Sequence, residues 1–217
     1  MPVGVIDYEA GNLRSVTNAL NLLHAAPVIV REASQLEGLD ALIFPGVGAF
    51  GDCLRHLEHQ GLVEPLRQWL LAGRPYLGIC LGYQLLFEGS EESPETEGLG
   101  IFKGQVVRFS PENRLKIPHM GWNNLKILRK EDPLWEGLPK NPFVYFVHSY
   151  FPRPEDTSII SATADYGEHF AASIRSGNLA ATQFHPEKSQ SVGLNLLKNF
   201  LLSACPSTVG GTAPSEP

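Results

Sequence analysis

The chain has 217 residues, 43% of them hydrophobic, which is long enough for one well-buried core and short for two. Its formal net charge of −6 argues against nucleic acid as a principal partner, because phosphate binding needs clustered Lys and Arg. No run approaches the roughly 18 apolar residues of a membrane span, and no signal-peptide pattern opens the chain, so we expect no membrane partner.

The first half of the chain alternates strand-like and helix-like runs, which predicts a parallel sheet with helices on both faces. The expected strands are residues 3–6, 27–30, 41–44 and 75–79, and the expected helices are residues 12–24, residues 53–71 and a helix that follows Cys80. Ligands bind such sheets at the carboxyl ends of the strands, so we expect the functional site at that edge.

A glycine-rich turn, Phe44-Pro-Gly46-Val47-Gly48, follows the third expected strand. Such a turn can direct backbone N–H groups into a site without side chains in the way. We expect the N–H groups of Val47 and Gly48, with that of Leu81 after the nucleophile, to form an oxyanion hole.

The fourth expected strand runs into Cys80, which Gly78 and Gly82 flank, and a helix is expected to follow. A residue on so sharp a strand-to-helix corner is forced toward solvent, and the glycines give the backbone room to bend. The N-terminus of the helix favours a negative charge. Cys80 is therefore a candidate thiolate nucleophile.

The second half of the chain carries shorter elements. Residues 89–100 are acidic and turn-rich, which predicts a surface loop beside the site. Short β-type runs separated by turns then predict a mixed or antiparallel extension of the sheet: residues 105–109, 124–128, 143–150, 158–162, 170–174 and 180–184, before a last helix at residues 193–202. We expect a single domain over residues 1–204 and a disordered tail over residues 205–217, which is small, polar and rich in Pro and Gly.

The last strand-like run leads into His185-Pro186-Glu187. Pro186 biases His185 away from helix, and residues two apart in an extended segment point to the same side, so the Glu187 carboxylate can reach the imidazole. Cys80, His185 and Glu187 then form a relay in which the histidine takes the thiol proton and the carboxylate fixes its tautomer. This pattern predicts acyl transfer.

Each motif also has a structural interpretation. A cysteine after an apolar strand is more often a small buried hydrophobe, and His-Pro-Glu alone is a common turn sequence. The glycines around Cys80 and the distant His-Pro-Glu together favour catalysis. Trp122, taken alone, is more typical of a core position.

The remaining cysteines and histidines indicate neither a disulfide framework nor a metal. Cys53, Cys80 and Cys205 are an odd number without paired or metal-site spacing, which fits a reducing, cytoplasmic environment. His56 and His59 lie one turn apart on an expected helix, but no third ligand is evident, so we expect no metal site.

In combination, Gly78-Ile-Cys80-Leu-Gly82-Tyr-Gln84 and His185-Pro-Glu187 resemble the motifs of the class I, or triad, glutamine amidotransferases. Within that class, Pro45-Gly-Val-Gly-Ala-Phe50, Pro118-His-Met-Gly-Trp-Asn123 and Tyr145-Phe-Val-His-Ser-Tyr150 resemble the family of glutaminase subunits of imidazole glycerol phosphate synthase. The resemblance runs from Val3 to about Leu202.

The resemblance implies a three-layer, flavodoxin-like α/β fold and a two-protein enzyme of histidine biosynthesis. This chain would hydrolyse L-glutamine to glutamate and ammonia without a cofactor. The ammonia would pass to a (β/α)8-barrel cyclase subunit, its partner in a heterodimer. There it would react with an aminoimidazole-carboxamide ribonucleotide that carries a phosphoribulosyl-formimino group, giving imidazole glycerol phosphate and the carboxamide ribonucleotide.

The resemblance also assigns residues to the pocket and to the partner. Gln84 and Glu92 would hold the α-amino and α-carboxylate end of glutamine, and the backbone of Gly48, His148, Ser149 and Tyr150 would complete the pocket. Val47 becomes the candidate allosteric switch, because the loop would turn an N–H toward the site when the partner's ligand binds. The partner-facing residues would be Asn12, Arg14, Pro118, His119, Met120, Gly121 and Trp122, with Trp122 on a turn as an interface anchor.

One departure and three alternatives stay open. Tyr83 stands where relatives usually carry methionine, which leaves the exit of ammonia undefined. The chain could serve another triad amidotransferase, such as those of anthranilate, aminobenzoate, carbamoyl phosphate or pyridoxal phosphate synthesis. It could also be a free-standing γ-glutamyl hydrolase, or a non-catalytic binding subunit that has kept the fold.

Overall fold

The computed structural model describes residues 1–9, 13–113 and 115–204. Two sequence-based predictions fall outside the described residues: the disordered tail at residues 205–217 and the partner-facing role of Asn12. No helix of the described ranges has both the length and the apolar character needed to cross a membrane.

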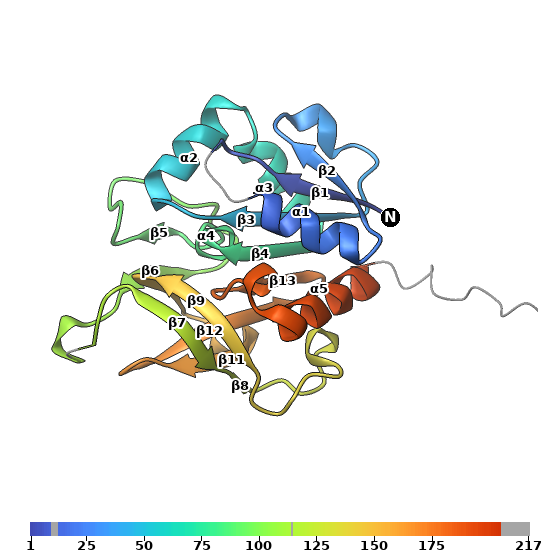
Figure 1. Ribbon diagram of the computed structural model, residues 1–217. Helices are drawn as coiled ribbons and strands as arrows, with labels where there is room; N and C mark the ends of the chain where they lie inside the picture. The colour runs from blue at the N-terminus through green and yellow to red at the C-terminus, as the bar shows by residue number, and fades with distance from the viewer. Residues whose placement is uncertain (10–12, 114, 205–217) are drawn as a thin grey trace, which may run out of the picture.

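Eight strands form the main sheet, in the order β2-β1-β3-β4-β13-β12-β11-β8 (Figure 1). The first five run parallel and the other three continue the sheet antiparallel. In this order, the strands are Ala26–Val30, Pro2–Ile6, Ala41–Gly46, Tyr76–Cys80, Leu179–Thr182, His169–Ser176, Ile160–Asp165 and Lys126–Ile127. The predicted α/β architecture, a mostly parallel sheet with an antiparallel extension, is confirmed.

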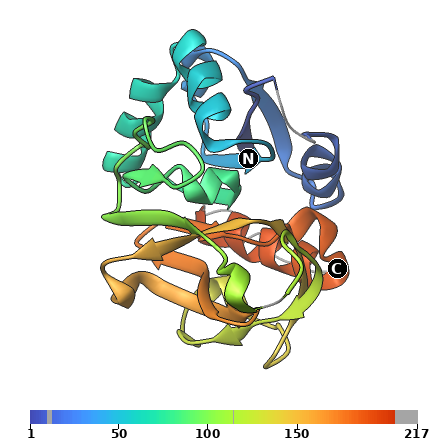
Figure 2. The same ribbon diagram turned by 90° about the vertical axis from the view of Figure 1, so that its left-hand side faces the viewer.

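Side chains of the parallel strands alternate between two buried faces, as expected for a sheet covered on both sides. Ala41 and Ile43 of β3 belong to one apolar cluster, with α1 (Leu13–Leu22) and α5 (Gln190–Ala204). Leu42 and Phe44 belong to the other, with α2 (Phe50–His59) and α3 (Val63–Leu71). Figure 2 shows these two pairs of helices on opposite sides of the strands. The result is three layers.

Smaller elements surround the main sheet. Strand β6 (Gly104–Arg108) lies between β10 (Tyr150–Pro154) and β5 (Gly89–Ser90), and β7 (His119–Asn124) pairs antiparallel with β9 (Phe143–His148). The short helix α4 (Leu81–Gln84) directly follows β4. Among the described residues there are also five 3-10 turns: Ala33–Leu36, Pro111–Asn113, Pro133–Trp135, Thr157–Ile159 and Pro186–Lys188.

The helix predicted over residues 53–71 is wrong as one element, because α2 ends at His59 and α3 begins at Val63. Gly61 has φ +65°, and the N–H of Leu62 donates to the carbonyl of Leu57 at 2.8 Å. This is a Schellman ending, in which a glycine adopts the left-handed conformation. Leu57 and Leu62 are both fully buried, so the break also packs against the core.

The helix predicted after Cys80 is present as α4. It lasts one turn, because the carbonyls of Leu85 and Leu86 accept the N–H groups of Leu99 and Ile101 at 2.8 and 2.9 Å.

One further prediction is corrected by pairing with a distant segment. The segment of residues 118–123, with Trp122, lies largely in strand β7 and is not a turn, because it pairs with β9.

Candidate active site

Three neighbouring parallel strands, β3, β4 and β13, bring the predicted motifs to one edge of the sheet. Gly46 at the end of β3 pairs with Cys80 at the end of β4, and Ile79 pairs with Thr182 at the end of β13. The segment that leads to His185 starts where β13 ends. Parallel order therefore places the glycine-rich loop, the cysteine and the histidine at adjacent carboxyl ends, where α/β sheets bind ligands.

Cys80 occupies a strained backbone position at the corner between β4 and α4. Its φ of 54° and ψ of −104° are unusual for a residue with a side chain, and such strain costs on the order of 1–3 kcal/mol. A Cβ on Gly78 would lie 2.5 Å from the carbonyl oxygen of Gly82, and a Cβ on Gly82 would collide with that of Phe44. Both glycines are therefore required for the corner that holds the thiol.

His185 and Glu187 form a buried pair beside Cys80. The His185 Nδ1 lies 2.7 Å from the Glu187 Oε1, and the two side chains are only 2% and 4% exposed. Since a carboxylate only accepts, Nδ1 carries the hydrogen and Nε2 is left for proton exchange. Burial tends to lower the pKa of His185, but the negative charges of Cys80 and Glu187 and the hydrogen bond to Glu187 raise it to about 10. The histidine is therefore protonated when it faces a thiolate.

The loop that carries His185 is fixed by its own hydrogen bonds. The His185 N–H donates to the carbonyl of Tyr145 at 2.9 Å, and the Ser189 hydroxyl donates to the carbonyl of His185 at 2.7 Å. The same hydroxyl oxygen accepts the N–H of Tyr145 at 2.9 Å. Strand β9 and the His185 loop are thereby joined, which limits how far the imidazole can move.

In the glycine-rich loop, one of the predicted oxyanion donors, the Val47 N–H, already makes a hydrogen bond to another residue. The Val47 N–H donates to the Tyr8 hydroxyl at 2.7 Å, and that hydroxyl donates to the Val47 carbonyl, also at 2.7 Å. Leu81 is the first residue of α4, so its N–H has no acceptor within that helix. In this conformation, the Val47 N–H is directed to Tyr8. The sequence analysis did not identify Tyr8, which is 39 positions from Val47.

A cavity of about 270 Å³ opens in front of the cysteine. This is slightly below the volume of pockets for drug-sized ligands, which suits an amino acid. Val147, which the sequence analysis did not single out, lines it with Val47, Gly48, Leu81 and the predicted partner residue Pro118. All five predicted glutamine-binding residues line it together with Cys80: Gln84, Glu92, His148, Ser149 and Tyr150.

Two of these glutamine-binding candidates already have partners within the protein. The Gln84 amide nitrogen donates to the carbonyl of Tyr150 at 3.0 Å and to the Gln183 Oε1 at 3.2 Å. The Glu92 Oε2 accepts the N–H of Phe50 at 2.8 Å, and Phe50 is the first residue of α2. One oxygen of Glu92 thus binds a helix N-terminus, a position that favours a carboxylate.

The ring of His148 is buried between other rings, and both its nitrogens have partners. Nδ1 lies 2.9 Å from the carbonyl of Tyr150, so it carries the hydrogen, and Nε2 then accepts from the His119 Nδ1 at 3.1 Å. Burial lowers the pKa of His119 to about 4 and that of His148 to about 3. Both rings are neutral at pH 7, and His148 lines the cavity.

Gln183 lies at the site but was not predicted from the sequence. This side chain is fully buried, and its amide nitrogen lies 3.5 Å from the Cys80 Sγ. A signal was present: Gln183 is two positions before His185, so in an extended segment both side chains point to the same side.

The predicted partner-facing residues differ in exposure. Along β7, Met120 is 62% and Trp122 47% exposed, whereas His119 is buried at 3%. Gly121 lies between them with φ +134°, and Arg14 is exposed on α1. The alternation of the strand thus presents two large apolar side chains to solvent and turns the histidine inward.

Tyr83 is directed away from the cavity, which it does not line. Its ring is fully buried against Phe87, and its hydroxyl donates to the carbonyl of Ala171 at 3.4 Å. The tyrosine at this position therefore leaves the space in front of Cys80 unchanged.

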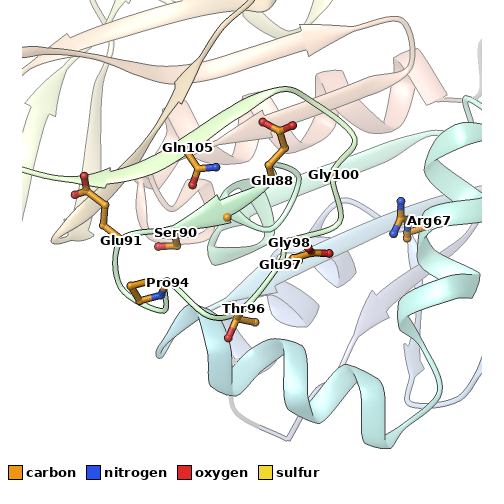
Figure 3. A pocket seen from close by; sticks show the side chains of 11 residues that line it. Arg67, Glu88, Ser90, Glu91, Pro94, Thr96, Glu97, Gly98, Gly100 and Gln105 are labelled. Carbon is orange, nitrogen blue, oxygen red and sulfur yellow. The ribbon is translucent and has the colours of Figure 1, made fainter.

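A larger cavity, of about 780 Å³, lies between residues 88–100 and Arg67 of α3 (Figure 3). Its glutamates are partly engaged: the carboxylates of Glu88 and Glu91 accept the N–H groups of Gly104 and Arg108 at 3.0 and 2.8 Å. No residue of the predicted triad lines this cavity. Within the described part of the chain, no group of three or more His, Cys, Asp or Glu could hold a metal ion.

Comparisons with known proteins agree with this geometry. Residues 4–204 match the family Glutamine amidotransferase class-I. The chain is 50% identical over 200 residues to the imidazole glycerol phosphate synthase subunit HisH of Thermosynechococcus vestitus, covering 92% of this chain and 95% of the relative. It is 49% identical over 203 residues to the HisH subunit of Nostoc punctiforme, covering 93% and 96%.

A solved structure described as a glutamine amidotransferase superimposes with a TM-score of 0.72 at 26% identity, covering 93% of this chain and 98% of that one. The fold, the family match and the similarity over nearly the whole length of the relatives all agree. The chain belongs to the class I glutamine amidotransferases and, within them, to the HisH subunits of imidazole glycerol phosphate synthase.

Proposed function

We propose that Cys80, His185 and Glu187 hydrolyse glutamine through a γ-glutamyl thioester. The Cys80 thiolate attacks the carbon of the side-chain amide, and the His185 imidazolium gives its Nε2 proton to the departing nitrogen, which leaves as ammonia. Water then attacks the thioester while His185 takes its proton, and the sulfur leaves as thiolate with glutamate as product. The observation that carries this proposal is the buried 2.7 Å contact between His185 and Glu187 beside a cysteine in a strained corner.

The negative oxygen that forms during each attack needs donors. Leu81 and Gly48 are the proposed donors in the present conformation, and Val47 is the proposed third. Because Tyr8 holds the Val47 N–H, that peptide has to turn before it can donate. Val47 therefore remains our candidate for the switch by which a bound partner raises activity, since one oxyanion donor is typically worth about 100- to 1,000-fold in rate.

Glutamine is proposed to enter the 270 Å³ cavity with its amide toward Cys80. Gln84 and Glu92 are the proposed contacts of its α-amino and α-carboxylate groups, with the backbone of His148, Ser149 and Tyr150 around it. Since Gln84 and Glu92 already bind Tyr150 and Phe50, the protein fixes their positions before substrate arrives. Such preorganisation lowers the entropy cost of binding.

The proposed partner is a cyclase subunit with a (β/α)8 barrel, in a cytoplasmic heterodimer. The curated relatives are named as subunits of imidazole glycerol phosphate synthase, so a second subunit is expected to receive the ammonia. Met120 and Trp122 support this surface, because large exposed apolar and aromatic side chains are typical interface anchors. Pro118 connects this surface with the cavity, which it lines.

The test is glutaminase activity of the purified chain, alone and with a cyclase subunit and its ribonucleotide ligand. We expect low activity alone, a steep rise with the liganded partner, and none above background with Cys80→Ala in either condition. High activity that ignores the partner would instead indicate a free-standing hydrolase. No activity in either condition would indicate a binding subunit.

A further inference from the structure

We propose that Gln183 is a positioning residue for the nucleophile: its amide N–H holds the Cys80 sulfur, and its amide oxygen holds Gln84 of the substrate cavity. This inference rests on the proposed glutaminase function and adds a residue to it. The Gln183 side chain would connect the Cys80 sulfur with Gln84, which lines the cavity.

The backbone of Gln183 is held in place by a hydrogen bond of its own. Its N–H donates to the carbonyl of Ala172 at 2.8 Å, just beyond the end of β13, and the residue is fully buried. From there the side chain reaches two other elements. The Nε2 lies 3.5 Å from the Cys80 Sγ, and the Oε1 lies 3.2 Å from the Gln84 Nε2.

The hydrogen-bond network determines which end of the amide faces the sulfur. The carbonyl of Tyr150 can only accept, so Gln84 must present its nitrogen to it, at 3.0 Å. The second N–H of that nitrogen needs an acceptor, which is the Gln183 oxygen at 3.2 Å. The Gln183 nitrogen is then left for Cys80. The donor directed at the sulfur is thus fixed by a backbone carbonyl of the glutamine pocket.

An N–H directed at sulfur favours the charged form over the thiol, because hydrogen bonds to an ionised group are the stronger ones. The protonated imidazole of His185 provides the positive charge that faces the Cys80 sulfur. Gln183 adds a neutral hydrogen-bond donor with a fixed position to the same sulfur. When the thioester forms, the sulfur loses its charge, and when the thioester is hydrolysed the charge returns. Gln183 is therefore expected to help the step in which sulfur leaves.

A structural interpretation of Gln183 is that it only satisfies buried polar groups. The two interpretations differ in one readout. A buried amide that only fills space would not change the pH at which Cys80 becomes reactive, whereas a donor to the sulfur would. The pH profile of alkylation therefore separates them, and it does not require that the protein hydrolyse glutamine.

The test compares Gln183→Met, which keeps the size but removes the donor, with Gln183→Glu, which keeps an oxygen for Gln84 but turns a negative oxygen toward the sulfur. Gln68→Met is the matched control, because Gln68 is exposed on α3 and its side-chain amide donates to the Glu64 carboxylate at 2.6 Å, away from Cys80. Alkylation of the Cys80 peptide by iodoacetamide is followed by mass spectrometry from pH 5 to pH 9. Steady-state kcat and KM are measured in the complex with the cyclase subunit.

For Gln183→Met, we expect half-maximal alkylation to move to higher pH and kcat to fall about 10- to 100-fold, with KM within about threefold of wild type. Gln183→Glu should move the alkylation midpoint further upward, and Gln68→Met should match wild type. If Gln183→Met does not fold, as judged by circular dichroism, Gln183→Glu alone decides the question.

An unchanged alkylation midpoint in the folded variants would overturn the proposal, whatever happens to kcat. If the wild-type protein shows no glutaminase activity that is lost in Cys80→Ala, the proposed function is overturned instead. The two failures are therefore distinguishable, because the alkylation midpoint is read without glutamine.

Discussion

At the scale of single residues, the hydrogen bonds between Tyr8 and Val47 hold the N–H group that we propose as a third oxyanion donor. One hydroxyl both accepts the Val47 N–H and donates to the Val47 carbonyl, so it holds the two peptide groups on either side of the Val47 Cα. Tyr8 itself is 1% exposed, and its ring lies 5.6 Å from that of Phe44 at the end of the neighbouring strand. The tyrosine is anchored in the core, and the loop is held against it.

Tyr8→Phe should therefore raise the glutaminase activity of the chain without its partner, because the ring still packs but the Val47 peptide is free to turn. We expect a rise of several-fold and a smaller stimulation by the liganded cyclase subunit. The measurement is steady-state glutamate release in both conditions. Tyr83→Phe is the control, since that hydroxyl bonds Ala171 and lies outside the cavity. Equal activity of Tyr8→Phe and wild type without the partner would contradict the role of this bond.

Whether a residue could be predicted from the sequence depended on the distance of its partner along the chain. The corner at Cys80 and the His185-Pro-Glu187 pair are local patterns, so their geometry follows from neighbouring residues. Tyr8 and Val47 are 39 positions apart, and Gln183 and Cys80 are 103 apart. No local pattern encodes the contact of Tyr8 with Val47. For Gln183, its place two positions before His185 indicates the side on which it lies but not its contact with Cys80, because such contacts arise only when strands from different parts of the chain become neighbours.

At the scale of elements, the corner between β4 and α4 depends on close contact with β3. The Gly82 backbone lies against the carbonyl of Phe44, and a Cβ there would collide with that oxygen. Backbone atoms of a central strand cannot move aside as a flexible side chain can. The geometry of Cys80 is therefore coupled to the spacing of two strands.

Gly82→Ala should destabilise the fold by about 1–3 kcal/mol and also lower kcat per folded molecule. The reason is that the added Cβ forces β3 and the corner that carries Cys80 apart. Gly61→Ala is the matched comparison: Gly61 has φ +65° but open space around it, and it does not line the cavity in front of Cys80. It should cost roughly 1 kcal/mol through strain alone and leave kcat unchanged. Denaturant unfolding and partner-stimulated kinetics measure both quantities. Full activity in folded Gly82→Ala would show that the corner tolerates displacement.

Most of the strands could be predicted because apolar runs in a parallel sheet are continuous and bounded by turn residues. The errors have specific physical causes. Gly61 ends α2 through its left-handed conformation, which the helical pattern of residues 53–71 concealed. Strand β7 was missed because its pairing with β9, and not its own composition, makes it extended.

At the scale of the whole molecule, two neutral histidines in the interior connect stability to pH. Burial lowers the pKa of His119 to about 4 and that of His148 to about 3, whereas histidine in an unfolded chain titrates near about 6.5. Between these values the unfolded chain binds more protons than the folded one. The contribution of His119 and His148 to stability is therefore fully present above about pH 6.5 and is lost as the pH falls toward 4.

The free energy of unfolding should accordingly decrease between pH 7 and pH 5 by up to about 1.4 kcal/mol per pH unit for each histidine. His119→Gln should reduce this slope, because one buried group no longer titrates. His169→Gln is the control, since the side chain of His169 is 82% exposed. Urea unfolding at pH 7, 6 and 5 gives the slopes. Parallel slopes for His119→Gln and wild type would rule out this origin.

The order of strands in the main sheet also bears on how the molecule is made on the ribosome. β13, which is close to the C-terminus, pairs with β4 on one side and β12 on the other, and His185 follows it. A nascent chain that ends before Leu179 therefore carries Cys80 without His185, its proposed base, on strand β4 with one edge still unpaired. Such an edge invites pairing with other chains. Synthesis thus leaves the thiol without its base until the last strand enters the middle of the sheet, at the risk of aggregation in the meantime.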